Sequence, residues 1–200
     1  MEEGMLFFWF SWIFWILVTF FMNRGKLRTY LAYWILLSII VSPFYVVIGQ
    51  YFVHLTVIIL LLGTMVLIAK QPRIPYYLFA SFTVTIGYTA LLLWEKISPI
   101  WLIIPRTLLI AVIIGCLVSI LSSYFHSRIS ICLFGFLSGE IIYSLILYSY
   151  GFQEEIGEMQ FLDTLLSTLL LLTIIDILYK GKTKLSRYVA KLQTKFEVAK

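Results

Sequence analysis

Glu140 is the one acidic or basic side chain in the apolar stretch from Ile129 to Tyr148, within the segment GFLSGEIIYS. If this stretch is a transmembrane helix, both membrane surfaces are roughly 14–16 Å from the residue. A glutamate is too short to reach water over that distance, so it must be protonated, paired or beside water. It is either a structural carboxyl bonded to a neighbouring helix, or a site for an ion, a proton or a polar substrate.

Three further ionisable residues are expected toward the same end of the molecule: Arg106, Asp163 and His54. Arg106 precedes the helix expected next to that of Glu140, and an arginine stem can reach inward by several ångströms. The four side chains could therefore converge on one intramembrane polar site.

Other motifs with chemistry are missing from the sequence. It has no P-loop, no GxGxxG, no HExxH and no GxSxG. Cys116 and Cys132 stand in apolar segments without metal-like spacing, so we interpret them as small buried apolar residues. The sequence predicts no catalytic residue, no metal and no cofactor.

The composition indicates a membrane protein. Hydrophobic residues make up 62% of the 200 residues and charged residues 12%, whereas soluble domains carry about 25% charged residues. Only lipid accommodates so much apolar surface, so we expect an all-α, polytopic membrane helix bundle over residues 1–180. The seven predicted spans are 5–22, 30–49, 51–69, 75–94, 107–125, 129–149 and 161–179.

Two boundaries are less well defined than the others. Pro43 should kink or shorten the second span. The segment 95–106 is apolar but carries Pro99 and Pro105. It is either an interfacial segment or the bent first turns of the fifth span.

Lysine and arginine predict the orientation. With the N-terminus outside and the C-terminus inside, thirteen of the fifteen basic residues fall on the inner face, as the positive-inside rule requires. Only Lys96 and Arg106 fall outside. Because topology accounts for the positive charge, we expect no binding of nucleic acid.

Small residues four apart suggest where helices approach closely. Gly135 and Gly139 share one face of the sixth span, and Gly115 and Ser119 share one face of the fifth. Such faces allow close backbone contact in lipid. We expect them to pack the hairpin of spans five and six, with a homodimer interface as the alternative.

The segment 181–200 predicts a basic amphipathic helix at the inner surface. Its apolar residues fall on one helical face, beside a basic stripe of Lys184, Arg187, Lys191 and Lys195. Such a helix suits anionic lipid headgroups, while a solvated basic tail is the alternative. Asp176, four residues before Lys180, is expected to pair with this basic region.

The chain resembles the YphA family of small, uncharacterised bacterial multi-pass membrane proteins. The resemblance lies in FFWFSWIFWILVTFFMNRGKLRTYLAYWIL, which begins at Phe7, and in SPF at 42–44. It implies a multi-pass protein of the bacterial cell membrane and implies no activity or site residue.

Three functions are compatible with the sequence. The first is a non-enzymatic membrane or envelope protein that acts through helix packing and membrane-protein partners, with Glu140 satisfied internally. The second is a small transporter or transporter subunit with a polar cavity reaching Glu140. The third, an enzyme acting on lipid, needs more convergent polar groups than the sequence supplies. We favour them in that order.

Overall fold

The computed structural model describes the backbone of residues 4–98 and 105–198, with side chains up to residue 183 except at position 27. In chain order the elements are α1 (Met5–Ile16), a π-helical segment η1 (Leu17–Phe21), α2 (Lys26–Val41), β1 (Tyr45–Ile48), β2 (Tyr51–His54), α3 (Leu55–Ala69), α4 (Ile74–Ile97), α5 (Arg106–Leu121), α6 (Phe125–Ser149) and α7 (Met159–Val198). The predicted all-helical class is confirmed, with one β-hairpin added. The uncertain segment 95–106 falls largely on residues 99–104, outside the described residues.

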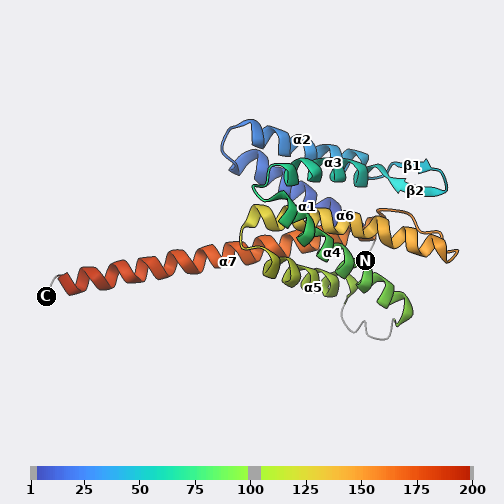
Figure 1. Cartoon of the computed structure of the whole chain (residues 1–200). Helices are drawn as coiled ribbons and strands as arrows, with labels where there is room; N and C mark the ends of the chain where they lie inside the picture. The colour runs from blue at the N-terminus through green and yellow to red at the C-terminus, as the bar shows by residue number, and fades with distance from the viewer. Residues whose placement is uncertain (1–3, 99–104, 199–200) are drawn as a thin grey trace.

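Helix α6 lies at the centre of the bundle (Figure 1), where it contacts α3, α4, α5 and α7. Thirteen of its 25 residues are buried. Helix α7 packs against α1 on one side and α5 on the other, while α2 packs mainly on α1 and α3. The core therefore surrounds the helix that carries Glu140.

The helices are of two lengths. Three apolar segments are long enough to cross a bilayer: Ile74–Ile97, Phe125–Ser149 and Met159–Thr183. Four shorter apolar helices are Met5–Phe21, Arg28–Val41, Leu55–Ala69 and Arg106–Leu121. At 14 to 17 residues, these reach about 21–26 Å, less than the roughly 30 Å hydrocarbon core.

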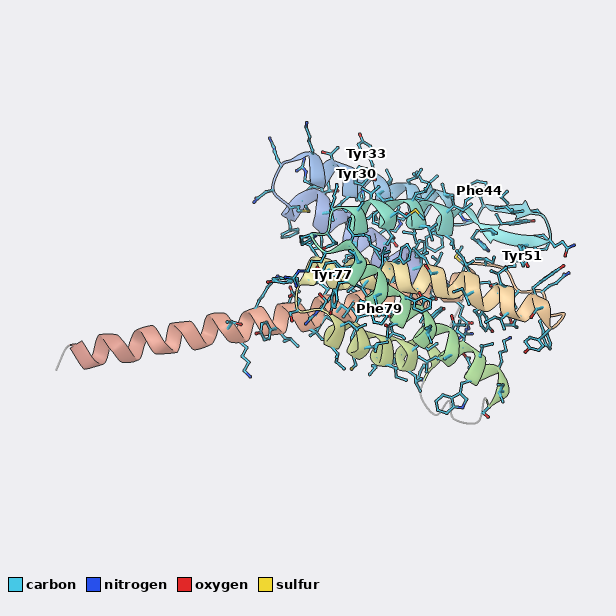
Figure 2. The ribbon with its side chains drawn as sticks, in the orientation of Figure 1. Tyr30, Tyr33, Phe44, Tyr51, Tyr77 and Phe79 are labelled. Atoms are coloured by element: carbon cyan, nitrogen blue, oxygen red, sulfur yellow. The ribbon has the colours of Figure 1, made fainter. Side chains whose placement is uncertain are left out.

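Large apolar side chains cover the outside of the bundle. Tyr33 on α2 and Phe79 on α4 are each 69% exposed, and Tyr33 lies at the outer edge of the bundle in Figure 2. Apolar side chains on an outer surface are what a lipid-facing helix presents.

The prediction that spans 30–49 and 51–69 are helical throughout is wrong at their junction. Helix α2 ends at Val41, and β1 and β2 form an antiparallel hairpin with Tyr45 opposite His54 and Ile48 opposite Tyr51. Pro43 cannot donate to a helix ladder, and the β-branched and aromatic residues that follow favour strands. Gly49, with φ of +66°, supplies the left-handed residue of the tight turn.

The hairpin explains why α2 and α3 are short. It projects beyond α2 and α3, on the side where α6 ends (Figure 1), and all four β1 residues are exposed. A strand edge with unpaired backbone groups is not tolerated in hydrocarbon, so the hairpin must lie at or beyond the membrane surface.

Charges separate to the two ends of the bundle. Glu95 pairs with Arg106, and Glu154 with Lys96, where α4, α5 and α6 meet. We call this the acidic end. The opposite end, where Gln71 of the α3–α4 turn meets Ser127 of α6, we call the basic end. It carries Arg24, Lys26, Arg28, Lys70, Arg73 and Arg128 in the helix connections and helix starts, and Lys180 and Lys182 on α7.

Helix α7 continues without interruption from the bundle to Val198. The segment after Lys180 is helical, as predicted, but extends α7 instead of starting a separate helix. Figure 1 shows it projecting well past the basic end. The side chains of Lys184, Arg187, Lys191 and Lys195 lie outside the described residues.

The orientation can be tested with single cysteines in a background lacking Cys116 and Cys132. Gln153, exposed in the α6–α7 loop, and Thr183, on α7 past the basic end, lie on opposite sides of the bundle. We expect an impermeant thiol reagent on intact cells to label Gln153→Cys alone, with both positions labelled after permeabilisation. Labelling of Thr183→Cys in intact cells would overturn the predicted orientation.

Candidate functional site

The glycines of α6 bring its backbone against α4, not against α5 as the sequence predicted. A Cβ atom on Gly135 would lie 2.5 Å from Val84 Cγ1, and one on Gly139 would lie 2.7 Å from Tyr88 Cδ1. Because contacts advance in the same direction along both helices, α4 and α6 run parallel. We call this contact the α4–α6 seam.

Threonine hydroxyls of α4 complete the seam. Thr85 Oγ1 donates to the Gly135 carbonyl at 3.3 Å, and Thr89 Oγ1 donates to the Gly139 carbonyl at 3.1 Å. Both threonines are buried. Each helix supplies a pair of residues spaced by four, so small residues and polar contacts reinforce each other.

The small residues of α5 do not pack against α6, as the sequence predicted, and Gly115 instead faces α7. A Cβ atom on Gly115 would lie 2.7 Å from Leu171 Cδ2 of α7. The Ser119 hydroxyl donates within its own helix, to the Gly115 carbonyl at 2.8 Å. Cys116, expected to be buried, is exposed on α5, while Cys132 is buried as expected.

Glu140 lies one residue beyond the glycine pair and is 6% exposed. Its Oε2 accepts a hydrogen bond from the Tyr88 hydroxyl at 2.9 Å. The backbone N–H of Gly157, in the α6–α7 loop, also bonds to the carboxyl group. The cost of placing a polar group in the bundle is therefore offset by internal hydrogen bonds.

Arg106, considered as the counter-charge of Glu140, pairs elsewhere. Its Nε lies 3.0 Å from Glu95 Oε2 of α4, and its guanidinium donates to Gln160 Oε1 of α7. Arg106 still acts on Glu140 through its electrostatic field, but the two form no ion pair.

Asp163 and His54 also have their own partners. The Asp163 carboxylate accepts hydrogen bonds from the backbone N–H of Phe7 at 2.7 Å and of Gly4 at 3.0 Å. It therefore caps the N-terminus of α1, where a negative charge is stabilised. His54 Nε2 lies 3.1 Å from Glu155 Oε2, and its Nδ1 lies 3.3 Å from the Ser42 carbonyl. The four predicted site residues occupy separate hydrogen-bonded groups.

Sequence reasoning missed the partner of Glu140. Tyr88 stands in SFTVTIGYTA (81–90), where only the hydroxyl residues Ser81, Thr85 and Thr89, each four apart, mark a polar face. That polar face was the available sign that α4 packs against α6, because its residues are four apart, like the glycines of α6. Nothing in the sequence links Arg106 to Glu95, since residues 99–104 separate their helices.

The described residues offer no metal centre: no group of three or more His, Cys, Asp or Glu among them could hold an ion. The expected pairing near the end of the last span is confirmed, with Lys180 Nζ 2.6 Å from Asp176 Oδ2.

Comparison with known proteins points to one family. The model of the YphA-like integral membrane protein family matches residues 3–197. "Uncharacterized protein YphA" of Bacillus subtilis (strain 168) is 21% identical over 175 residues, covering 85% of each chain. No solved structure matches significantly.

The seam predicts the effect of added methyl groups. Gly135→Ala should lower the free energy of unfolding by about 1–3 kcal/mol, because the neighbouring Val84 and the Ser81 carbonyl leave no room. Gly181→Ala is the matched control, since its Cβ would meet nothing within 4 Å and alanine favours helix. Thermal unfolding in detergent measures the stability of both variants. Equal unfolding temperatures for Gly135→Ala and Gly181→Ala would contradict close packing at the α4–α6 seam.

The Tyr88–Glu140 bond predicts coupling in a double-mutant cycle. Tyr88→Phe should destabilise by about 1–3 kcal/mol because a buried acceptor loses its donor. In a Glu140→Leu background the same change should cost at least ~1 kcal/mol less. Tyr77→Phe, on the same helix, is the control and should be additive with Glu140→Leu. Additivity for both pairs would show that the bond contributes nothing to stability.

Proposed function

Because the chain belongs to the YphA-like integral membrane protein family, we propose a non-enzymatic protein of the bacterial cell membrane. It acts through helix packing and contacts with partners. Seven spans, with the N-terminus outside and the C-terminus inside, are part of this proposal. The positive-inside count and the separation of charges between the two ends support it.

The internal bonding of Glu140 carries the proposal. A transport site needs an ionisable group that a substrate can reach, yet Glu140 is 6% exposed and bonded to Tyr88. Four cavities formed by the described residues do not include Glu140 in their linings. A carboxyl held in this way supports a role in fixing α4 against α6.

A small transporter is the second candidate, and one observation favours it. Tyr143, one turn beyond Glu140 on α6, interacts electrostatically with Glu140 and hydrogen-bonds to Glu154 at the acidic end. Glu154, Tyr143, Glu140 and Tyr88 thus form a series of polar groups from the acidic end toward the interior, with hydrogen bonds at its two ends and only an electrostatic interaction between Tyr143 and Glu140. A proton could pass along such a path.

The partners of the first candidate would meet α7 or the basic end. Helix α7 extends past the bundle and carries the predicted basic stripe, which suits anionic lipid headgroups. A membrane-protein partner or a second copy could bind the exposed apolar helix faces.

Water access to Glu140 distinguishes the two candidates. Glu140→Cys and Ser144→Cys place thiols one turn apart on α6, at positions 6% and 3% exposed. In the background lacking Cys116 and Cys132, we expect a charged thiol reagent to leave both unlabelled in the folded protein. Gln153→Cys is the positive control.

Ser144→Cys is the conservative variant, so the test does not depend on the stability of Glu140→Cys. Labelling of both buried cysteines at a rate close to that of Gln153→Cys would reveal an aqueous route. That result would reject the first candidate and support the transporter.

A further inference from the structure

An elongated apolar cavity of about 180 Å³ lies between α1, α2, α6 and α7. Residues spaced by three or four line it on each helix, for example Ser11 and Phe14 on α1, and Leu31 and Trp34 on α2. Leu60 of α3 also contributes to the wall. The cavity therefore follows the helix axes instead of crossing them.

The cavity lining is almost entirely apolar, and of its three hydroxyl groups only that of Ser11 has no hydrogen bond to the described residues. The Ser38 hydroxyl donates to the Trp34 carbonyl at 2.9 Å, and the Thr173 hydroxyl donates to the Leu169 carbonyl at 2.7 Å. Water needs two to four polar partners to occupy a buried site. An apolar chain fits this lining and water does not.

The cavity runs inward from the basic end of the bundle. Its α2 wall runs from Leu31 to Ser38, which is about 8–18 Å from the start of α2 at Lys26. On α1 and α7 the lining extends further, to Phe7 and Leu165, so the cavity runs from the acyl-chain layer next to the basic end past the middle of a hydrocarbon core of roughly 30 Å.

Cations lie one or two helical turns beyond the lining residues, at the basic end. Arg28 precedes Leu31 by three residues and so shares its face of α2. Lys180 Nζ lies 5.4 Å from the Phe125 ring, and Phe125 is one turn before the lining residue Ile129. Lys180 itself pairs with Asp176, so the net positive charge of this end comes from Arg28 with Arg24, Lys26 and Lys182, and a phosphate would share Lys180 with Asp176. The rim is therefore complementary to an anion.

We propose that this cavity binds an acyl chain of an anionic phospholipid from the leaflet at the basic end. The phosphate group lies beside Arg28 and Lys180, and the chain runs between α1, α2, α6 and α7. The site would tie the lightly packed α2 to the centre of the bundle. It does not depend on the role of Glu140 and goes beyond the function proposed above.

Native mass spectrometry of the full chain in detergent tests the proposal. Dioleoyl phosphatidylglycerol and dioleoyl phosphatidylcholine have the same chains, so they compare headgroup charge alone. Because each cation near an anionic headgroup contributes about fivefold in affinity, we expect about tenfold or greater retention of one phosphatidylglycerol molecule.

Arg28→Gln and Lys180→Gln, made separately, should each reduce this preference about fivefold. Arg73→Gln is the matched control, because it removes a cation of the basic end from the α3–α4 turn, away from the cavity. The control should keep the full preference. Two variants are used because the Arg28 guanidinium also donates to the Thr19 carbonyl at 3.4 Å, so its loss could affect folding.

Filling the cavity tests the acyl-chain part. Ser38→Phe and Ser11→Leu fill it from opposite walls and should abolish retention of either lipid, while the lipid-free unfolding temperature stays at or above that of the wild type. Equal retention of the two lipids would overturn the proposal. So would loss of preference in Arg73→Gln, or unchanged lipid retention in both filled variants that fold. A dimer without lipid would instead identify a second copy as the occupant.

Discussion

The α4–α6 seam is the contact on which the rest of the bundle depends. In lipid no hydrophobic force drives helices together, so close backbone packing and interhelical hydrogen bonds must do so. Gly135 and Gly139 allow the approach, and Thr85 and Thr89 bond to their carbonyl groups. The Tyr88–Glu140 bond continues the same contact toward the acidic end, so Glu140 stabilises a helix pair already brought together by its neighbours.

The parallel direction of this pair determines the arrangement around it. The chain can place α4 and α6 parallel only if a segment between them in the sequence runs back in the opposite direction. Helix α5 is that segment. Helix α5 packs mainly on α7, with Gly115 against Leu171, and only lightly on α6. Its first residue, Arg106, then lies between α4 and α7, where it forms an ion pair with Glu95 and donates a hydrogen bond to Gln160. The pairing of Arg106 with Glu95 therefore follows from chain direction, which residue spacing cannot indicate.

Hydropathy predicted the helical class and the helix positions, because a long apolar run in lipid has few alternatives to a helix. It was wrong for residues 42–54, where the run continues but Pro43 and Gly49 change the backbone conformation. The small-residue faces were found, yet their partners were misassigned, because spacing identifies a face and not what it meets. Tyr88 was missed since a single tyrosine in an apolar helix carries no signal of its own.

The two parts of the bundle differ in how tightly they are held. Helices α4–α7 share close glycine contacts, whereas α1 and α3 join them through apolar packing on α7 and α6 and through polar connections near the acidic end, and α2 contacts mainly α1 and α3. Asp163 caps α1, and the His54 amide donates to the Ile156 carbonyl at 2.9 Å. Toward the basic end the apolar cavity separates α2 from α6 and α7. A ligand there would change the position of α2 more readily than that of α4 or α6, so the adaptable element of this fold is α2.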